Sequence, residues 1–185
     1  YKRQMLKIPD ENYLFEQLAR FEVNRIIELK EGLSNLIASR YLDTWREMYK
    51  RFQSREGFSP MSDAMANRAL ANLAFEYVAR GMDSEELADF VKSQYFKANN
   101  LTDRKTALNF VSRDPRLSMQ VGDEVLEDFY EKWSSEALVL DIWFSVQAQS
   151  SLTSIESRFL NNTTKMAKPI AASAAATVKT KNTTT

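Results

Sequence analysis

The side chains available for chemistry in this sequence are carboxylates, lysines and tyrosines, because its 185 residues include no His and no Cys. Without His there is no Ser-His-Asp triad, no His-paired base and no His-based zinc or iron site. Without Cys there is no thiolate nucleophile, disulfide or Cys-based metal site. The acids form two clusters, one of Asp83, Glu85 and Glu86 and one of Asp123, Glu124, Glu127 and Asp128. Neither has the D-x-[DN]-x-[DN]-G spacing of a calcium loop, so we interpret both as solvated helix N-termini and expect no catalytic residue, metal or cofactor.

Three groups of residues have both a functional and a structural interpretation. Residues 99–103, Asn-Asn-Leu-Thr-Asp, suit a polar recognition turn or a helix cap, and capping is the commoner use of these side chains. Asp141 lies in an apolar run, where it would be a buried acid with a raised pKa or a hydrogen-bonded structural carboxylate. Trp133, Trp143 and Phe144 would form a base-stacking platform or core aromatics. We interpret all three groups as structural.

The elements that must position these residues are helices. Apolar residues recur at spacings of three and four through most of the chain, and strand-like alternation appears nowhere at useful length. The predicted helices cover residues 10–18, 26–52, 65–81, 84–97, 102–111, 121–133 and 138–148. The second of these is either one long helix or two helices joined near Gly32. We therefore predict an all-α protein of about eight helices in an irregular antiparallel, α-superhelix-like stack.

Local features predict where these helices end and which faces they bury. Asp10 is expected to be an N-cap, and Asp83 and Glu86 resemble a capping box. Thr102 or Asp103 is expected to cap the helix that ends at residue 111. Gly81 stands where a helix C-terminus favours a left-handed residue. The run 138–148 is apolar nearly all round, which predicts a helix buried on all sides. The predicted buried face of the helix over 26–52 consists of Ile26, Leu29, Leu33, Leu36, Ile37, Leu42, Trp45, Met48 and Phe52.

The composition changes at about residue 160, which predicts a helical domain over 1–160 and a low-complexity Ala/Thr/Lys tail over 161–185. The chain carries 25 basic and 25 acidic residues, whereas the tail contains four lysines and no acid, so residues 1–160 have a net charge of −4. The tail lysines are Lys165, Lys168, Lys179 and Lys181. We expect the tail to be extended and either solvated or held along a partner protein, with its lysines facing acids there.

Charge and hydropathy also limit the partners. The balanced total charge predicts no nucleic-acid binding, and the absence of a long apolar run predicts no membrane span, although the tail lysines permit peripheral membrane contact. The chain begins at Tyr1 rather than Met, which suggests a processed or partial product. An organelle such as a mitochondrion or plastid, after removal of a targeting peptide, and the cytoplasm are the two compartments we consider.

Two ordered blocks resemble the C-terminal helical domain of the bacterial-type aminopeptidase N family. The first, with Gln94, Ala98, Asn99, Asn100, Thr102 and Asp103, is similar to its signature Q-[YF]-x-x-A-[DN]-N-M-T-D. The second, with Phe129, Tyr130, Trp133, Asp141, Trp143, Phe144 and Gln147, is similar to F-Y-x-x-W followed by L-V-x-D-K-W-F-x-[LI]-Q-A. Weaker similarity at residues 6–14 and 68–73 extends the resemblance over roughly residues 1–150. The chain departs from the pattern at Ile142, where the family has Lys, and after Ser151, where the family continues into further helix pairs.

The resemblance implies a helical module that closes over a catalytic domain and restricts access to its chamber. The zinc site of the family, an H-E-x-x-H helix and a distant Glu, belongs to a preceding domain, so no zinc ligand is carried over to this chain. Three functions follow as hypotheses: a non-catalytic structural or interaction subunit bound to other protein subunits, the C-terminal piece of a zinc aminopeptidase, and a peptide-binding module that uses the concave face of the stack. We favour the first, because the tail replaces the further helices that an enzyme fragment would have.

Overall fold

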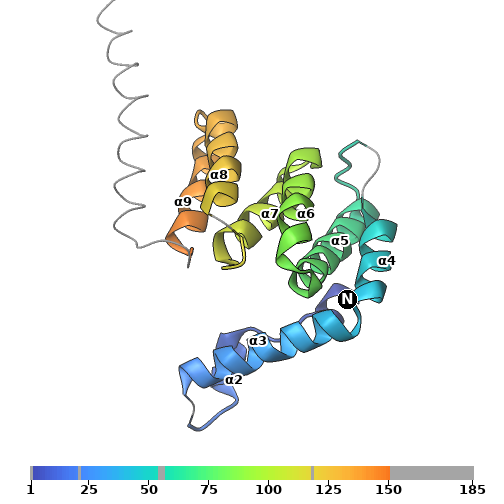
Figure 1. Cartoon of the computed structure of the whole chain (residues 1–185), viewed down its shortest axis with the longest axis vertical. Coiled ribbons are helices and arrows are strands. Elements are labelled where there is room, and N and C mark those ends of the chain that lie inside the picture. The colour runs from blue at the N-terminus through green and yellow to red at the C-terminus, as the bar shows by residue number, and fades with distance from the viewer. Residues whose placement is uncertain (1, 21, 54–56, 118, 151–185) are drawn as a thin grey trace, which may run out of the picture.

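A computed structural model of the chain describes residues 2–20, 22–53, 57–117 and 119–150 (Figure 1). These residues form helices and no strand, which confirms the all-α prediction. The helices are α1 (Lys2–Leu6), α2 (Glu11–Glu16), α3 (Val23–Arg40), α4 (Leu42–Phe52), α5 (Ser62–Gly81), α6 (Ser84–Lys97), α7 (Leu101–Arg113), α8 (Met119–Trp133) and α9 (Ala137–Ala148). None of these described helices is both long enough and apolar enough to cross a bilayer. The tail and its four lysines lie outside the described residues.

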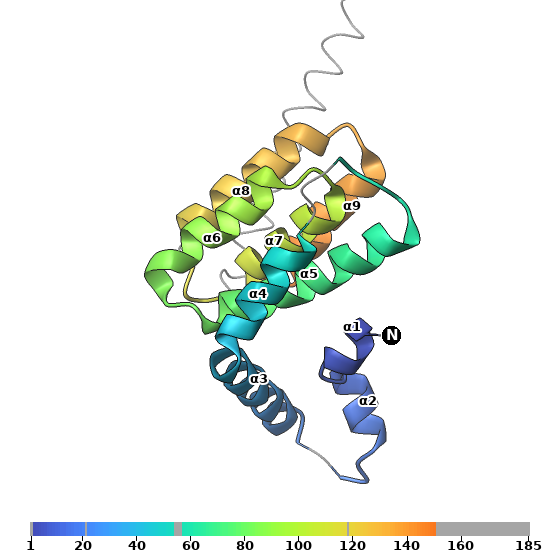
Figure 2. The same ribbon diagram turned by 90° about the vertical axis from the view of Figure 1, so that its right-hand side faces the viewer.

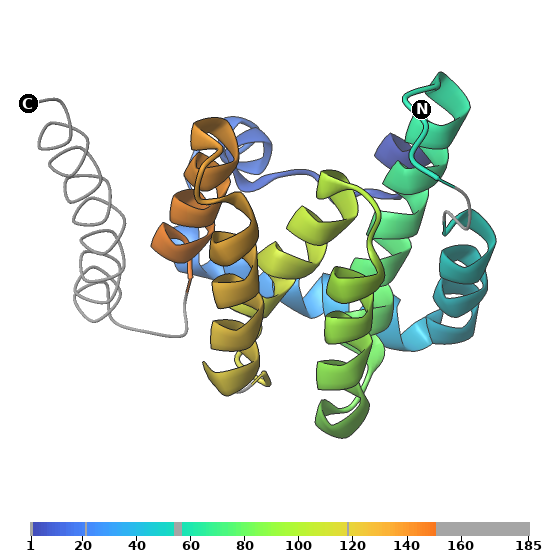
Figure 3. The same ribbon diagram turned by 90° about the horizontal axis from the view of Figure 1, so that it is seen from above.

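Three antiparallel helix pairs stand side by side and form the stack: α4 with α5, α6 with α7, and α8 with α9 (Figures 1 and 3). Helices α5, α7 and α9 contact one another in sequence as one layer, and α6 and α8 contact each other in a second layer. Each pair therefore packs against its neighbour, as the repeat units of a solenoid do. The predicted antiparallel stack is confirmed.

A continuous apolar core runs through the stack. Its fully buried members include Phe75 of α5, Tyr95 of α6, Leu108 of α7, Phe129 of α8 and Trp143 of α9. A smaller cluster joins α3, α4 and α5, where the rings of Trp45 and Tyr77 stack with their centroids 4.3 Å apart. Trp133 and Phe144 also pack against the main core, as expected for core aromatics. The helix pairs are thus held by burial rather than by local propensity.

The predicted helix over residues 26–52 is in fact two helices, and they are divided at Tyr41 rather than near Gly32. Helix α3 passes through Gly32 without interruption and ends at Arg40, and the chain turns at Tyr41 into α4. A further short helix, α1, precedes Pro9 and was not predicted. Gly81 is not left-handed, because the described residues include no glycine with a positive φ. Close packing favours glycine there instead: a Cβ would lie 2.8 Å from Leu42 Cδ1, the end of a side chain that can shift, and 3.2 Å from the Ala38 carbonyl oxygen, a tight contact with the backbone.

Two predicted faces are wrong. The leucines Leu29, Leu33 and Leu36 were expected in the core, but they are 57%, 46% and 62% exposed, and α3 buries only Ala38. We call Leu29, Leu33 and Leu36 the leucine row. Helix α9 was expected to be buried on all sides, yet it buries only Trp143, Val146 and Gln147 and leaves Leu138 85% exposed. Periodicity identified these helices correctly, but it did not reveal which face meets a neighbour.

Helices α1, α2 and α3 form an arm beside the stack (Figure 2). Helix α3 and the short α1 both contact α5, and α2 contacts α3. A salt bridge between Lys30 of α3 and Glu11 of α2, 2.8 Å from nitrogen to oxygen, ties the arm together. Asp10 caps α2 as predicted, accepting a hydrogen bond from the backbone N–H of Tyr13 at 2.9 Å. The arm and the layer of α5 and α7 therefore face each other across a groove.

Candidate functional site: a polar network and a basic groove

The first block of motif residues belongs to a hydrogen-bond network that joins α4, α5, α6 and α7. Tyr49 donates to Gln94 Oε1 at 2.5 Å, Gln94 Nε2 donates to Asn72 Oδ1 at 3.4 Å, and Asn72 Nδ2 donates to Asp103 Oδ1 at 2.8 Å. Gln94 and Asn72 are both buried. Since an unpaired buried amide is costly, each member fixes the position of the next.

The same network caps α7. Asn100 is the N-cap: its Oδ1 accepts from the backbone N–H of Asp103 at 2.9 Å, and its Nδ2 donates to Asp103 Oδ2 at 2.8 Å. Asn99 accepts a further bond from Asn100, and the Ala98 carbonyl accepts two from the Arg104 guanidinium. The capping interpretation is confirmed. The cap is Asn100 rather than Thr102 or Asp103, which lie inside the helix.

The electrostatics of the network make it a structural element. Burial, and secondarily the nearby Asp103 carboxylate, raise the pKa of Tyr49 to about 12. Tyr49 therefore stays protonated and remains a hydrogen-bond donor at physiological pH. The neighbouring motif residue Tyr95 donates to Asp128 of α8 at 2.8 Å, and burial followed by that carboxylate raises its pKa as well. Neither phenol is a candidate base.

The second block fixes α9 against α8. The Trp143 indole N–H is buried and donates to the Leu126 carbonyl at 2.8 Å, and Gln147 donates back to the Trp143 carbonyl at 3.5 Å. The indole N–H of Trp133 is buried without a hydrogen-bond partner in the described part of the chain. Asp141 is exposed on α9, so the expectation of a buried or hydrogen-bonded carboxylate is wrong. The family lysine that Ile142 replaces would have stood next to a solvated acid.

A clamp at the end of α5 holds the α7–α8 connection. The Arg116 guanidinium donates to the carbonyls of Ala79 at 3.0 Å and Met82 at 2.7 Å, and it pairs with Asp114 at 2.6 Å. These carbonyls end α5 and lack partners within that helix. Partial burial alone would raise the pKa of Asp114, but hydrogen bonds from the Arg116 side chain and backbone outweigh it and lower the pKa. Asp114 and Arg116 of this clamp also line a groove between the arm and the stack.

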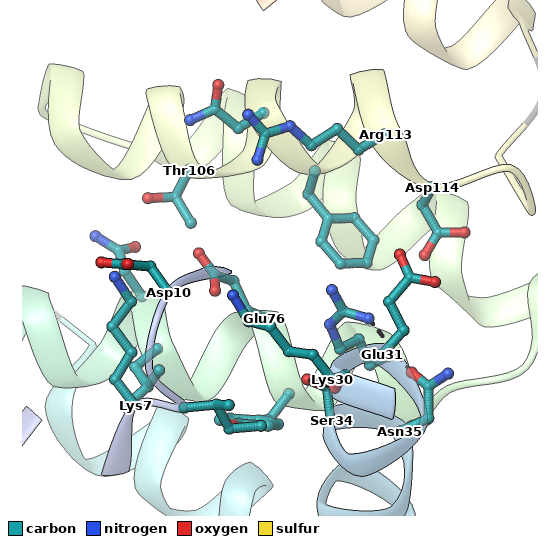
Figure 4. A pocket seen from close by; sticks show the side chains of 18 of the residues that line it. Lys7, Asp10, Lys30, Glu31, Ser34, Asn35, Glu76, Thr106, Arg113 and Asp114 are labelled. Carbon is teal, nitrogen blue, oxygen red and sulfur yellow. Dashed lines mark hydrogen bonds between the residues drawn. The ribbon is translucent and has the colours of Figure 1, made fainter. Parts of the chain in front are cut away.

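The groove itself has a volume of about 1390 Å³ (Figure 4). One side of α5, including Met65, Asn72 and Glu76, forms its floor, and Thr106, Asn109 and Arg113 of α7 continue it. The opposite wall is the arm, with Lys30, Glu31, Ser34 and Asn35 of α3 and residues from Arg3 to Glu11. The volume exceeds the roughly 300–1,000 Å³ of sites that enclose small molecules. Its size and openness suit a segment of polymer better than a metabolite.

Within the groove, the carboxylate of Glu76 lies among basic side chains. Glu76 makes no hydrogen bond or ion pair within the described residues, and the bases whose charges act on it are Arg80, Arg3, Lys7 and Arg113. Solvent reaches Glu76 through the open groove, but protein surrounds it on several sides. This burial raises the pKa of Glu76, and the four bases offset the effect only in part. Glu76 is therefore a carboxylate without a described partner, placed within a group of four bases.

The described residues contain no group of three or more His, Cys, Asp or Glu side chains close enough to hold a metal ion. The two acid clusters of the sequence instead lie on helices. Asp83 caps α6, accepting from the backbone N–H groups of Glu85 and Glu86 at 3.1 Å, as predicted. The second cluster lies inside α8 rather than at its N-terminus, and Asp128 pairs with Lys132 and Glu124 with Lys92, so the prediction of a solvated helix N-terminus is wrong for this cluster. These acids stabilise helix ends and surfaces.

Comparison with known proteins places this architecture in a family. Residues 1–169 match the family described as "Domain of unknown function (DUF3458_C) ARM repeats". The chain belongs to this family. The ARM-repeat domain is 28% identical to Aminopeptidase N of Escherichia coli over 153 residues, 27% identical to that of Haemophilus influenzae over 144, and 28% identical to that of Caulobacter vibrioides over 151.

These alignments cover 82%, 78% and 80% of this chain but only 17%, 16% and 17% of the relatives. The chain therefore spans about a sixth of the length of the curated relatives it matches. The predicted resemblance to the C-terminal helical domain of aminopeptidase N is confirmed. The family match also continues past residue 160, where the sequence predicts the start of the tail.

The sequence motifs identified only some members of the hydrogen-bond network that joins α4, α5, α6 and α7. They singled out Gln94, Asn100 and Asp103 but not Tyr49 or Asn72. Asn72 did carry a signal, because it interrupts an apolar run between Ala71 and Leu73 and would need a partner in the core. The groove residues Arg3, Lys7 and Glu76 carried none. They lie far apart in sequence, and only the packing of α1 against α5 brings them together.

Proposed function

We propose that this ARM-repeat domain is a non-catalytic structural or interaction subunit that binds another protein through its arm. The observation that carries the proposal is the leucine row, three leucines on one face of α3 that are exposed among the described residues. Leu29, Leu33 and Leu36 are spaced by four and three residues, which is the spacing that a partner helix or groove accepts. Contiguous exposed apolar surface is a feature of protein contact sites, and this row supplies such surface along one face of a helix.

The chemistry of the chain supports a non-catalytic role. The sequence contains no His and no Cys, and the described carboxylates are paired, capping, solvated or surrounded by bases. Purified chain incubated with zinc and an aminoacyl chromogenic substrate is expected to release no product above the blank. Turnover that a chelator abolishes would contradict this expectation.

A second function is favoured by the similarity to the three curated proteins named Aminopeptidase N. In this alternative, the chain is the helical part of a zinc aminopeptidase, and the leucine row packs against the catalytic part. Both functions place a protein surface on α3. They differ in the identity of that protein.

One experiment tests the contact and separates the two functions. A photo-crosslinking residue is introduced at Leu33, or at Glu47 as an exposed control on α4, in the full chain within its native cells. We expect a protein adduct from position 33 and none from position 47, and we expect Leu29→Glu to remove the adduct. An adduct whose partner carries H-E-x-x-H supports the aminopeptidase alternative, and any other recurrent partner supports the subunit. The absence of an adduct at position 33 would overturn the proposal.

A further inference from the structure

We propose that the groove between the arm and the stack binds an extended, acidic polypeptide segment. Leu29 and Leu33 of the leucine row lie outside this groove, and only Leu36 belongs to both. Its evidence is the shape of the groove, the hydrogen-bonding groups along its walls and an excess of bases at its centre. The inference does not depend on which protein covers α3.

The shape fits a chain in extended conformation. The floor follows α5 from Met65 to Arg80, a distance of about 22 Å at the rise of an α-helix. Extended polypeptide advances about 3.3–3.6 Å per residue, so the floor accommodates about six to seven residues. Amide groups face this path from both sides. Asn109 of α7 has no described side-chain partner, and Asn35 of α3 accepts from Arg80 and keeps its own N–H groups. Such amides can pair with both the N–H and the C=O groups of a peptide backbone.

Pairing within the groove leaves basic groups in excess. Among its acids, Glu11 pairs with Lys30, Asp114 pairs with Arg116, and Asp10 caps α2. Glu31 and Glu76 remain without a described partner. Four bases act on Glu76, and the side chains of two of them, Arg3 and Lys7, make no hydrogen bond or ion pair within the described residues. A carboxylate on the bound segment would supply the charge that this group lacks.

The same observations favour a polypeptide over a nucleic acid. Residues 1–160 have a net charge of −4, so the surface of the helical domain outside the groove disfavours a phosphate backbone, while the groove is locally basic. Ile8, Ile27 and Phe110 also line the groove and offer apolar contacts to side chains between the acidic positions. The negative charge of Glu76 lowers the affinity of the groove for the acidic segment, because the two charges repel each other.

The test uses the full chain and fluorescein-labelled octapeptide mixtures with a fixed central residue, Glu, Lys or Leu, and Ala, Ser, Leu and Gln elsewhere. Fluorescence anisotropy is expected to show the Glu mixture binding about tenfold more tightly than the Lys mixture at low salt, with the difference shrinking as salt is added. Arg3→Gln with Lys7→Gln should weaken Glu-mixture binding about fivefold or more. Lys50→Gln with Lys97→Gln, exposed bases outside the groove, should leave it unchanged.

The decisive variant is Glu76→Gln, which should tighten binding of the Glu mixture about two- to fivefold because it removes the opposing charge. Glu47→Gln is the matched control and should have no effect. Leu29→Glu should also leave peptide binding intact, which separates this site from the leucine row. The proposal is overturned if no mixture binds, if the Lys mixture binds as tightly as the Glu mixture, if Glu76→Gln weakens binding, or if oligo-dT displaces the peptide.

Discussion

Helices α3 and α5 are of similar length, 18 and 20 residues, but they are stabilised in different ways. Helix α5 buries ten residues, including Phe75, Val78 and the polar Asn72, between its neighbours in the stack. Helix α3 buries only Ala38 and turns its leucine row outward. The comparison shows that amphipathic periodicity identifies a helix but not its partner. The stack is stabilised by its own packing, whereas α3 of the arm keeps apolar side chains exposed among the described residues.

The largest expected effect on stability comes from truncating a core side chain of α5. An apolar side chain of α3 is the comparison, and truncating it should have little effect. Phe75 is fully buried, so Phe75→Ala should lower the free energy of unfolding by about 3–5 kcal/mol through lost burial and a residual cavity. Leu36 is mostly exposed, so Leu36→Ala should change it by less than about 0.5 kcal/mol. Urea denaturation followed by circular dichroism measures both values. Similar losses for the two variants would show that the arm is part of the cooperative core.

A smaller effect is expected from the polar network inside the stack. Asn72→Ala leaves Gln94 and Asp103 without their shared partner and should cost about 1–3 kcal/mol. Asn67→Ala, an exposed position on the same helix, is the matched control and should be neutral or slightly stabilising because Ala favours helices. Chemical denaturation of the two variants gives the comparison directly. Equal stability of the two would mean that the network does not hold α5 to α6 and α7.

The smallest of the three effects concerns the clamp at the end of α5. Arg116→Ala removes the bonds to the α5 carbonyls and should cost about 1–2 kcal/mol at neutral pH, while Arg40→Ala on the exposed arm should cost little. The folded-state pKa of Asp114 is lowered, so its stabilising contribution is present above the unfolded pKa and disappears as pH falls through the folded value.

Thermal unfolding of Arg116→Ala and the unmodified chain between pH 7 and pH 2 measures this contribution. The difference in melting temperature should be largest near neutral pH. It should narrow as the pH falls below about 4, the ordinary pKa of an aspartate, because Asp114 then becomes protonated in the unfolded chain and, through its lowered folded-state pKa, in the folded chain as well. A difference that stays constant over this range would show that the Asp114–Arg116 pair does not contribute to stability.

Local chemistry in the sequence was enough to place the helices and several of their ends. Spacings of three and four identified α5, α6 and α8, and the short polar side chains of Asp10 and Asp83 marked two N-caps, because capping depends only on residues within one turn. The motif blocks identified the family for the same reason: Gln94 and Trp143 stand at fixed distances along the chain from their neighbours in each block.

Tertiary packing decided which faces are covered and which distant residues meet. Three features depend on contacts between separate helices: the exposure of the leucine row, the close approach that favours glycine at position 81, and the pairing of Asn72 with Asp103. The groove is the clearest case, because Arg3, Glu76 and Arg113 become one electrostatic group only after α1 packs against α5 and α7 stacks beside it. A sequence specifies the period of each helix through short-range sterics. The burial that selects a face is a property of the assembled fold.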